Sequence, residues 1–190
     1  MNLEKNKVYR FKSVSEQVIT QTINGVQQTT ESKVNYSLSL KMIDATSDFM
    51  ITEIHLDTLI TNTNAMGKVV SMSSAIQGDI TSSKTDDVIS YIMNRLSKNA
   101  LYVKLDFSGK PFEIVNLEML SGLVLKDTSS ITLSGQTGAA VKKEITNMLS
   151  DNSFKTIIGM FTWFLPGKQI STGDTWNIKQ QMNSGGMMLD

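Results

Sequence analysis

Cysteine is absent from this chain of 190 residues, and its absence removes several kinds of chemistry. Without thiols the protein has no disulfide bond, no cysteine nucleophile and no cysteine-ligated zinc site. The absence does not assign a compartment, because many periplasmic proteins also lack cysteine. Export is therefore neither supported nor excluded by cysteine usage.

Net charge and long apolar runs are also missing. The chain carries 18 basic and 18 acidic side chains, so we expect no global basic field that would attract nucleic acid or an anionic membrane. No apolar run approaches the ~18–20 residues that a membrane-spanning helix needs. Residues Met1–Lys5 lack the apolar core of a signal peptide, which suits a cytosolic protein or the mature part of an exported one. The sequence predicts no nucleic-acid partner and no transmembrane segment.

Motifs that mark an active site are absent too. The glycines at 135 and 138 and at 185 and 186 form neither a dinucleotide-binding fingerprint nor a phosphate-binding loop. No serine lies in a nucleophile motif, and a Ser-His-Asp triad would have to use His55, the only histidine. We therefore expect that the protein is not an enzyme and that it uses no cofactor.

One group of side chains has the chemistry of metal ligands. Glu53, His55 and Asp57 are spaced by two residues, so in a strand they share one face. Such neighbours stand roughly 6.6–7 Å apart, and they converge on one cation only if the strand bends. The wet face of an amphipathic strand explains the same pattern. These three residues are the only support for a metal-dependent hydrolase.

A hairpin signal near the start of the chain indicates antiparallel β structure. Asn24-Gly25 suits a two-residue type I′ turn, in which both residues need a positive φ. The run that follows it is apolar at every second position, at Val34, Tyr36, Leu38, Leu40 and Met42. That alternation predicts a strand with one dry face and one wet face.

The same periodicities place the other elements. We expect strands over residues 8–22, 26–42, 49–61, 68–74, 101–107, 112–116 and 174–181. We expect helices over residues 85–96, from about residue 117, and over residues 139–149 and 154–164. Together they predict a single α+β domain over residues 1–190, with a curved, half-barrel-like antiparallel sheet and about three helices covering one face. A turn at residues 183–186 followed by Met187-Met188-Leu189 predicts that the sheet continues past residue 190.

Three local details are predicted as well. The apolar positions of the first strand change from odd to even around Val14–Val18, which predicts a bulge or bend. Residues 62–67 are expected to form a turn, and the 85–87 segment to cap the first helix. The apolar face of the third strand is predicted to carry Met50, Ile54, Leu56 and Ile60.

The segment Ile157–Leu165 is apolar nearly all round, so a helix there must be covered on most sides. It suits a core helix that lies on the sheet. It also suits a helix over a concave sheet that leaves a cavity for an apolar ligand, and the 12 methionines fit either arrangement. The candidate residues of such a cavity are Met160, Phe161, Trp163 and Phe164.

Several short motifs carry a resemblance when they are taken in order. They are Tyr9-Arg10-Phe11, Asp106-Phe107-Ser108-Gly109-Lys110, Leu165-Pro166-Gly167-Lys168 and Gly173-Asp174-Thr175-Trp176. In this order the chain resembles a domain-of-unknown-function family of secreted Bacteroidetes lipoproteins. The resemblance implies export to the periplasm or the outer-membrane surface, a lipid anchor in the precursor and a further β portion. The sequence lacks the lipobox cysteine of that family. More loosely, the expected sheet is similar to the half-barrels of periplasmic lipoprotein carriers.

Three functions remain open at this point. The leading hypothesis is a non-enzymatic extracytoplasmic protein that binds an apolar or amphiphilic ligand between the sheet and the 154–164 helix. The second is a ligand-free structural or protein-interaction domain of the cell envelope, with an open sheet edge after Trp176 and the Asn24-Gly25 hairpin as contact surfaces. The third is the metal-dependent hydrolase.

Overall fold

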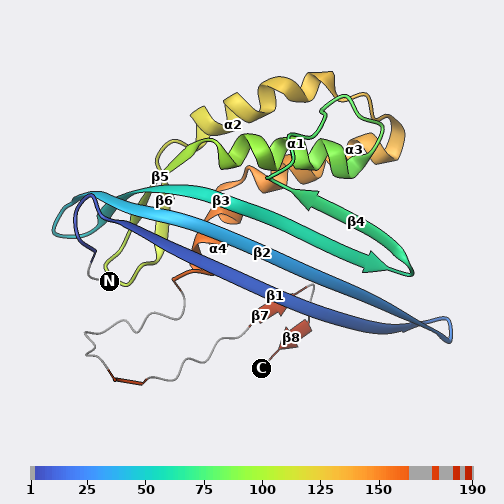
Figure 1. Cartoon of the computed structure of the whole chain (residues 1–190), viewed down its shortest axis with the longest axis horizontal. Coiled ribbons are helices and arrows are strands. Elements are labelled where there is room, and N and C mark those ends of the chain that lie inside the picture. The colour runs from blue at the N-terminus through green and yellow to red at the C-terminus, as the bar shows by residue number, and fades with distance from the viewer. Residues whose placement is uncertain (1–2, 163–172, 176–181, 185–186, 190) are drawn as a thin grey trace.

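The computed structural model describes residues 3–162, 173–175, 182–184 and 187–189, and shows a curved, unclosed antiparallel sheet with helices (Figure 1). The strands of this sheet are β1 (Val8–Ile23), β2 (Val26–Ala45), β3 (Met50–Ala65), β4 (Lys68–Ser73), β5 (Ala100–Leu105) and β6 (Pro111–Ile114). The helices are α1 (Thr85–Ser97), α2 (Leu117–Leu125), α3 (Gly135–Met148) and α4 (Asp151–Gly159), with a 3-10 turn at Lys126–Ser130. The α+β fold predicted from the sequence is confirmed.

The strands follow the order β1-β2-β3-β5-β6, and β4 also pairs with β3. The predicted turn between β1 and β2 is confirmed as type I′, since Asn24 and Gly25 have φ of 52° and 77°. A second turn of this kind joins β3 to β4 at Met66 and Gly67, with φ of 53° and 78°. β3 therefore continues to Ala65, and the longer turn predicted over residues 62–67 is wrong.

The bulge predicted in β1 is also wrong. β1 and β2 pair without interruption from Val8 opposite Lys41 to Ile23 opposite Val26. The apolar pattern changes because Val14 and Val18 lie exposed on the outer face of the sheet, the face away from the helices. The far end of this hairpin extends away from the helices, so neither of its faces needs a continuous apolar stripe (Figure 1).

A bulge occurs instead between β2 and β3. Ser37 pairs with Thr58 and Ser39 with His55, so Leu56 and Asp57 together lie opposite one residue of β2. The buried positions of β3 consequently change from even numbers at Leu56 to odd numbers at Leu59. Ile60, which we expected on the same face as Leu56, therefore lies on the outer face.

The core lies between the inner face of the sheet and the helices. α1 packs against β3 and β4, and its buried residues include Val88, Ile89, Ile92, Met93 and Leu96. The cap predicted at residues 85–87 is wrong, because the N-cap residue is Lys84 and no side chain caps the helix; Asp86 and Asp87 lie in its first turn. Residues 126–138, between α2 and the predicted start of the third helix at residue 139, contain the 3-10 turn and the first turn of α3.

The last helix differs from its predicted extent of residues 154–164. α4 begins earlier, because the Ser150 hydroxyl accepts a hydrogen bond from the backbone N–H of Ser153 at 3.2 Å. It ends at Gly159, and the N–H of Phe161 donates to the carbonyl of Ile158, a tight three-residue turn. Residues 163–172 and most of the final strand predicted over residues 174–181 lie outside the described residues. A separate two-stranded sheet pairs β7 (Met182–Ser184) with β8 (Met187–Leu189).

Candidate functional site

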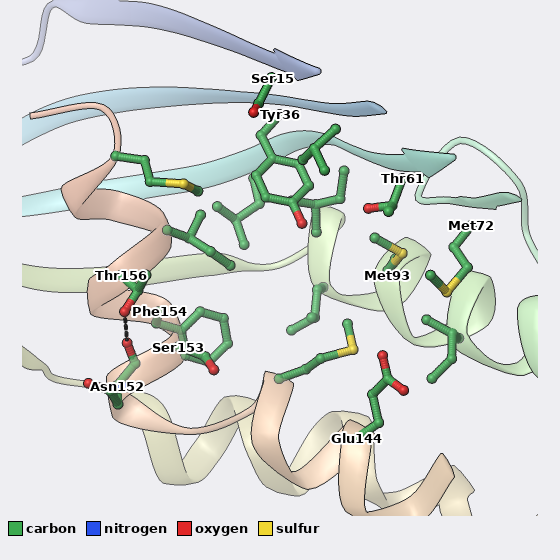
Figure 2. Close-up of a pocket in the computed structure, with 18 of the residues that line it drawn as sticks. Ser15, Tyr36, Thr61, Met72, Met93, Glu144, Asn152, Ser153, Phe154 and Thr156 are labelled. Atoms are coloured by element: carbon green, nitrogen blue, oxygen red, sulfur yellow. Dashed lines mark hydrogen bonds between the residues drawn. The ribbon is translucent and has the colours of Figure 1, made fainter. Parts of the chain in front are cut away.

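A cavity of about 660 Å³ lies between the inner face of the sheet and helices α1, α3 and α4 (Figure 2). Its floor consists of buried apolar side chains from three elements: Leu56 and Leu59 of β3, Ile89, Met93 and Leu96 of α1, and Phe154 of α4. A surface of this kind provides apolar contact and no hydrogen-bond partner for a polar group.

The β2–β3 bulge shapes this floor. Without the extra residue, a period of two would direct Leu56 and Leu59 to opposite faces of β3. The bulge directs both side chains toward the helices, where Met93 of α1 lies across from them. The lining also includes Met72 of β4, Met148 of α3 and Met160, which follows the end of α4. Flexible, polarizable thioethers allow such a lining to adapt to ligands of different shape.

The rim of the cavity is polar and opens to solvent. Its polar residues are Ser15, Gln17, Thr61, Glu144, Asn152, Ser153 and Thr156, of which most are exposed. Two of the hydroxyls are already used within the protein: Thr156 donates to the carbonyl of Asn152 at 2.8 Å, and Ser153 donates to the carbonyl of Asn147 at 2.7 Å. Glu144 is the only carboxylate among the lining residues in the described part of the chain. An apolar floor with a polar mouth suits an amphiphilic ligand.

The structure divides the four cavity residues predicted from the sequence. Met160 lines the cavity at its rim, where 37 % of the residue is exposed. Phe161 is buried and packs edge-on against Phe11, with ring centroids 6.4 Å apart, so it belongs to the core. Trp163 and Phe164 lie outside the described residues. α4 contributes five lining residues, and β3, α1 and α3 together contribute eight more, on elements that the sequence marked only as apolar faces.

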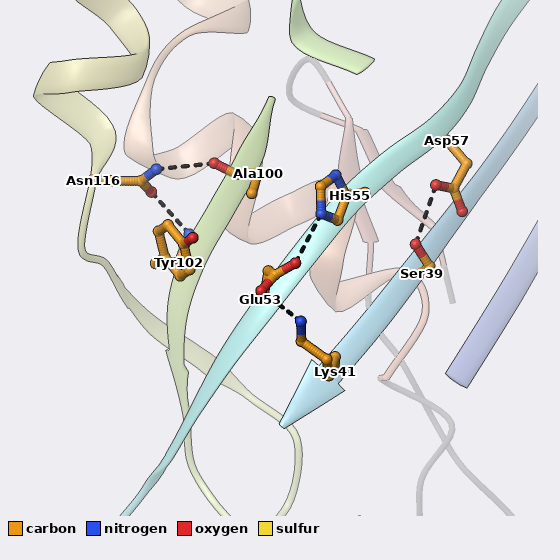
Figure 3. A network of polar contacts seen from close by, with 8 residues as sticks. All are labelled: Ser39, Lys41, Glu53, His55, Asp57, Ala100, Tyr102 and Asn116. Atoms are coloured by element: carbon orange, nitrogen blue, oxygen red, sulfur yellow. Dashed lines mark hydrogen bonds and ion pairs between the residues drawn. The ribbon is translucent and has the colours of Figure 1, made fainter. Parts of the chain in front are cut away.

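The candidate metal ligands lie on the outer face of the sheet, away from the cavity (Figure 3). The two carboxylate oxygens of Glu53 contact Lys41 Nζ at 2.8 Å and His55 Nε2 at 3.0 Å. Hydrogen bonds from Lys41 and then His55 lower the pKa of Glu53. Asp57, one of the two bulge residues, accepts a hydrogen bond from the Ser39 hydroxyl at 3.1 Å.

This arrangement is an ion-pair network. Lys41 and His55 each contact one carboxylate oxygen of Glu53, so both oxygens already have a partner within the protein. Within the residues that the structure describes, no three histidine or carboxylate side chains lie close enough to hold a metal ion.

The same region contains a link between β5 and α2. Asn116, which precedes α2, accepts a hydrogen bond from the N–H of Tyr102 at 2.8 Å and donates one to the carbonyl of Ala100 at 2.9 Å (Figure 3). One side chain thus pairs with two backbone groups of β5 and fixes where α2 begins. Sequence reasoning missed this role, because an asparagine before a helix indicates only a cap.

No curated protein and no solved structure matches the chain. In the described part of the chain, no helix is both long and apolar enough to cross a membrane. One family model matches residues 47–190, which include β3 and the helices of the cavity but not the β1–β2 hairpin. The chain therefore belongs to a family of unknown function, DUF6263.

Proposed function

We propose that this protein is a non-enzymatic binding domain that holds an apolar or amphiphilic ligand in the cavity between the sheet and helices α1, α3 and α4. The observation that carries the proposal is the combination of a buried apolar floor with a polar mouth that opens to solvent. The volume of about 660 Å³ falls within the roughly 300–1,000 Å³ of typical ligand sites.

The chemistry of the lining favours binding over catalysis. The described lining residues contain serines and threonines but no histidine or lysine that would activate them as nucleophiles. Among the lining residues that the structure describes, Glu144 has no second carboxylate beside it of the kind that sugar hydrolysis uses. An apolar chain would contact Leu56, Leu59 and Met93, and a polar end group would remain near Glu144 in contact with water.

We also propose that the full protein is exported and anchored to the cell envelope by lipid, in the periplasm or on the outer-membrane surface. The resemblance to secreted Bacteroidetes lipoproteins supports this proposal. The looser similarity of the sequence-predicted sheet to the half-barrels of periplasmic lipoprotein carriers suits the same location. Fractionation of cells that express the natural gene is the test. Recovery in the cytosolic fraction, without incorporation of labelled fatty acid, would overturn it.

Native mass spectrometry of protein purified from a bacterial host tests the binding proposal. We expect an added mass that solvent extraction removes and that analysis identifies as a lipid or another apolar molecule. A clean mass of the chain alone, which stays unchanged after incubation with a lipid extract, would contradict the proposal.

A further inference from the structure

The open edge of the sheet at β1 carries an inference that does not depend on the cavity. β1 is 16 residues long, and among the described residues it pairs only with β2 (Figure 1). A long strand edge presents unpaired backbone groups to any further strand. Val14 and Val18 on this strand are 52 % and 68 % exposed. The strand therefore has both the backbone groups and the apolar surface for another strand.

The hairpin turn determines which backbone groups of β1 are open. In a two-residue type I′ hairpin the residues that flank the turn, Ile23 and Val26, exchange two hydrogen bonds. Hydrogen-bonded pairs then recur at every second residue, so the odd-numbered residues of β1 bond to β2. The even-numbered residues, from Val8 to Thr22, direct their N–H and C=O groups to the open edge. A further antiparallel strand can form a complete hydrogen-bond ladder with β1 if the unpaired N–H and C=O groups of that strand also lie on every second residue.

The charges on β1 are complementary to a second copy of β1. Lys12 and Glu16 lie two residues to either side of Val14, and all three side chains are exposed. If two β1 strands run antiparallel with Val14 opposite Val14, each Lys12 lies opposite Glu16 of the second copy. Glu16 already forms an ion pair with Lys33 of β2. Glu16 of each copy would then lie between Lys33 of its own chain and Lys12 of the second copy, so the charges alternate across the strands.

We propose that two copies of this protein join through their β1 strands, in this register, to form one continuous antiparallel sheet. Residues Val8 to Thr20 of both copies overlap in this arrangement. The register shifted by two residues, which would place Arg10 opposite Glu16, overlaps only from Val8 to Val18. Of the two registers that place a basic residue opposite Glu16, the proposed one thus has the longer ladder. The register shifted in the other direction overlaps from Val8 to Thr22 but places Glu16 opposite Val14, so it forms no charge pair at this position.

The dimer also changes the surroundings of the cavity. Gln17 of β1 lies at the cavity rim. In the proposed register Phe11 of the second copy lies opposite Gln17 on the inner face of the sheet. An aromatic side chain would extend the apolar surface beside each cavity, so dimer formation and ligand affinity would be coupled if both proposals hold.

Sedimentation velocity over a concentration series tests the proposal with charge variants. We expect the wild type to dimerise and Lys12→Glu to weaken the dimer about tenfold, because two opposite-charge pairs become like-charge pairs. Arg10→Glu is the matched control, since Arg10 lies opposite uncharged Val18 in this register, and it should retain most of the affinity. An equal mixture of Lys12→Glu and Glu16→Lys should form a heterodimer more tightly than either variant alone forms a homodimer.

A proline variant tests the backbone pairing. The N–H of Val14 is directed to the open edge, so Val14→Pro blocks a further strand while it leaves the β1–β2 ladder in place. We expect a monomer with a far-ultraviolet circular dichroism spectrum like that of the wild type. A wild type that is monomeric far above micromolar concentration overturns the proposal. An unchanged dimer in Val14→Pro, or an Arg10→Glu dimer weakened as much as that of Lys12→Glu, also overturns it.

Discussion

Gly78 provides the prediction whose magnitude follows most directly from the structure. This residue lies in the loop between β4 and α1, with φ of +65° and its backbone against the helix. A Cβ atom at Gly78 would stand 2.4 Å from the backbone N of Tyr91 and 2.5 Å from the carbonyl O of Asp87. Both neighbours are backbone atoms of α1, so either the loop or the helix has to move in Gly78→Ala.

The expected loss of stability has two parts. A left-handed backbone conformation costs a non-glycine residue roughly 1–2 kcal/mol. Forcing an extra carbon into a packed contact costs roughly 1–3 kcal/mol more. Gly67 is the matched control, because its φ is +78° and nothing lies within 4 Å of its Cβ position. Gly67→Ala should therefore show only the cost of the left-handed conformation. Gly78→Ala should be less stable than Gly67→Ala by about 1–3 kcal/mol, the cost of the extra contact.

Urea denaturation followed by circular dichroism measures both variants. The difference between their free energies of unfolding isolates the contact between the loop and α1. Since α1 also carries Met93 and Leu96 of the cavity floor, a shift of this helix should weaken ligand binding in Gly78→Ala and not in Gly67→Ala. Equal free energies of unfolding for the two variants would refute the reasoning.

Two further predictions concern the polar groups of the sheet. Hydrogen bonds from Lys41 and then His55 lower the pKa of Glu53 below its ordinary value of 4.5. The charged form of Glu53 therefore stabilises the fold at any pH above 4.5. This stabilisation is lost as the pH falls through the lowered pKa of the folded state. Glu53→Gln should lower the free energy of unfolding by about 1 kcal/mol at neutral pH and make it depend less on pH below neutrality. Unfolding measured at a series of pH values from neutral to acidic checks this. The same loss of stability with falling pH in Glu53→Gln and in the wild type would contradict the assignment. Asn116→Ala removes two hydrogen bonds and leaves the N–H of Tyr102 unpaired, which should cost about 2–3 kcal/mol. Hydrogen exchange should then be faster at the start of α2 than in α3, and uniform exchange would count against the role of Asn116.

The elements that the sequence predicted well are those with local signals. Asn24-Gly25 fixes a turn by its own conformational preferences, and the alternation after it fixes a strand without knowledge of any partner. The apolar spacing of α1 likewise indicates a helix and the face that it buries. Such signals are sufficient for the fold class and for the order of the elements.

The details that the sequence did not predict depend on contacts between elements. The bulge at Leu56 and Asp57 is defined by the register of β3 against β2, and no residue in β3 marks it. Met66 adopts a positive φ, which is unusual for its type and becomes evident only in the folded hairpin. Lys41 reaches Glu53 from the neighbouring strand, and that contact turns a candidate metal ligand into one partner of an ion pair.

The cavity shows the same limit. Met160 and Phe161 are adjacent and both apolar, yet the first lines the cavity and the second packs against Phe11 in the core. The difference arises because α4 ends at Gly159 and the following turn directs the two side chains to different surroundings. Periodicity identifies which residues are buried, but the space left between the sheet and the helices depends on how all these elements pack.

Titration with the uncharged fluorescent probe N-phenyl-1-naphthylamine tests the central claim most directly. Met148, half-buried at the end of α3, lines the cavity, so Met148→Trp should fill part of it. Met119, exposed on α2 and outside the cavity lining, is the matched control. The account predicts saturable binding to the wild type and to Met119→Trp, and binding to Met148→Trp that is at least tenfold weaker with an unchanged circular dichroism spectrum. No saturable binding to the wild type, or equal affinity for the two variants, would contradict it.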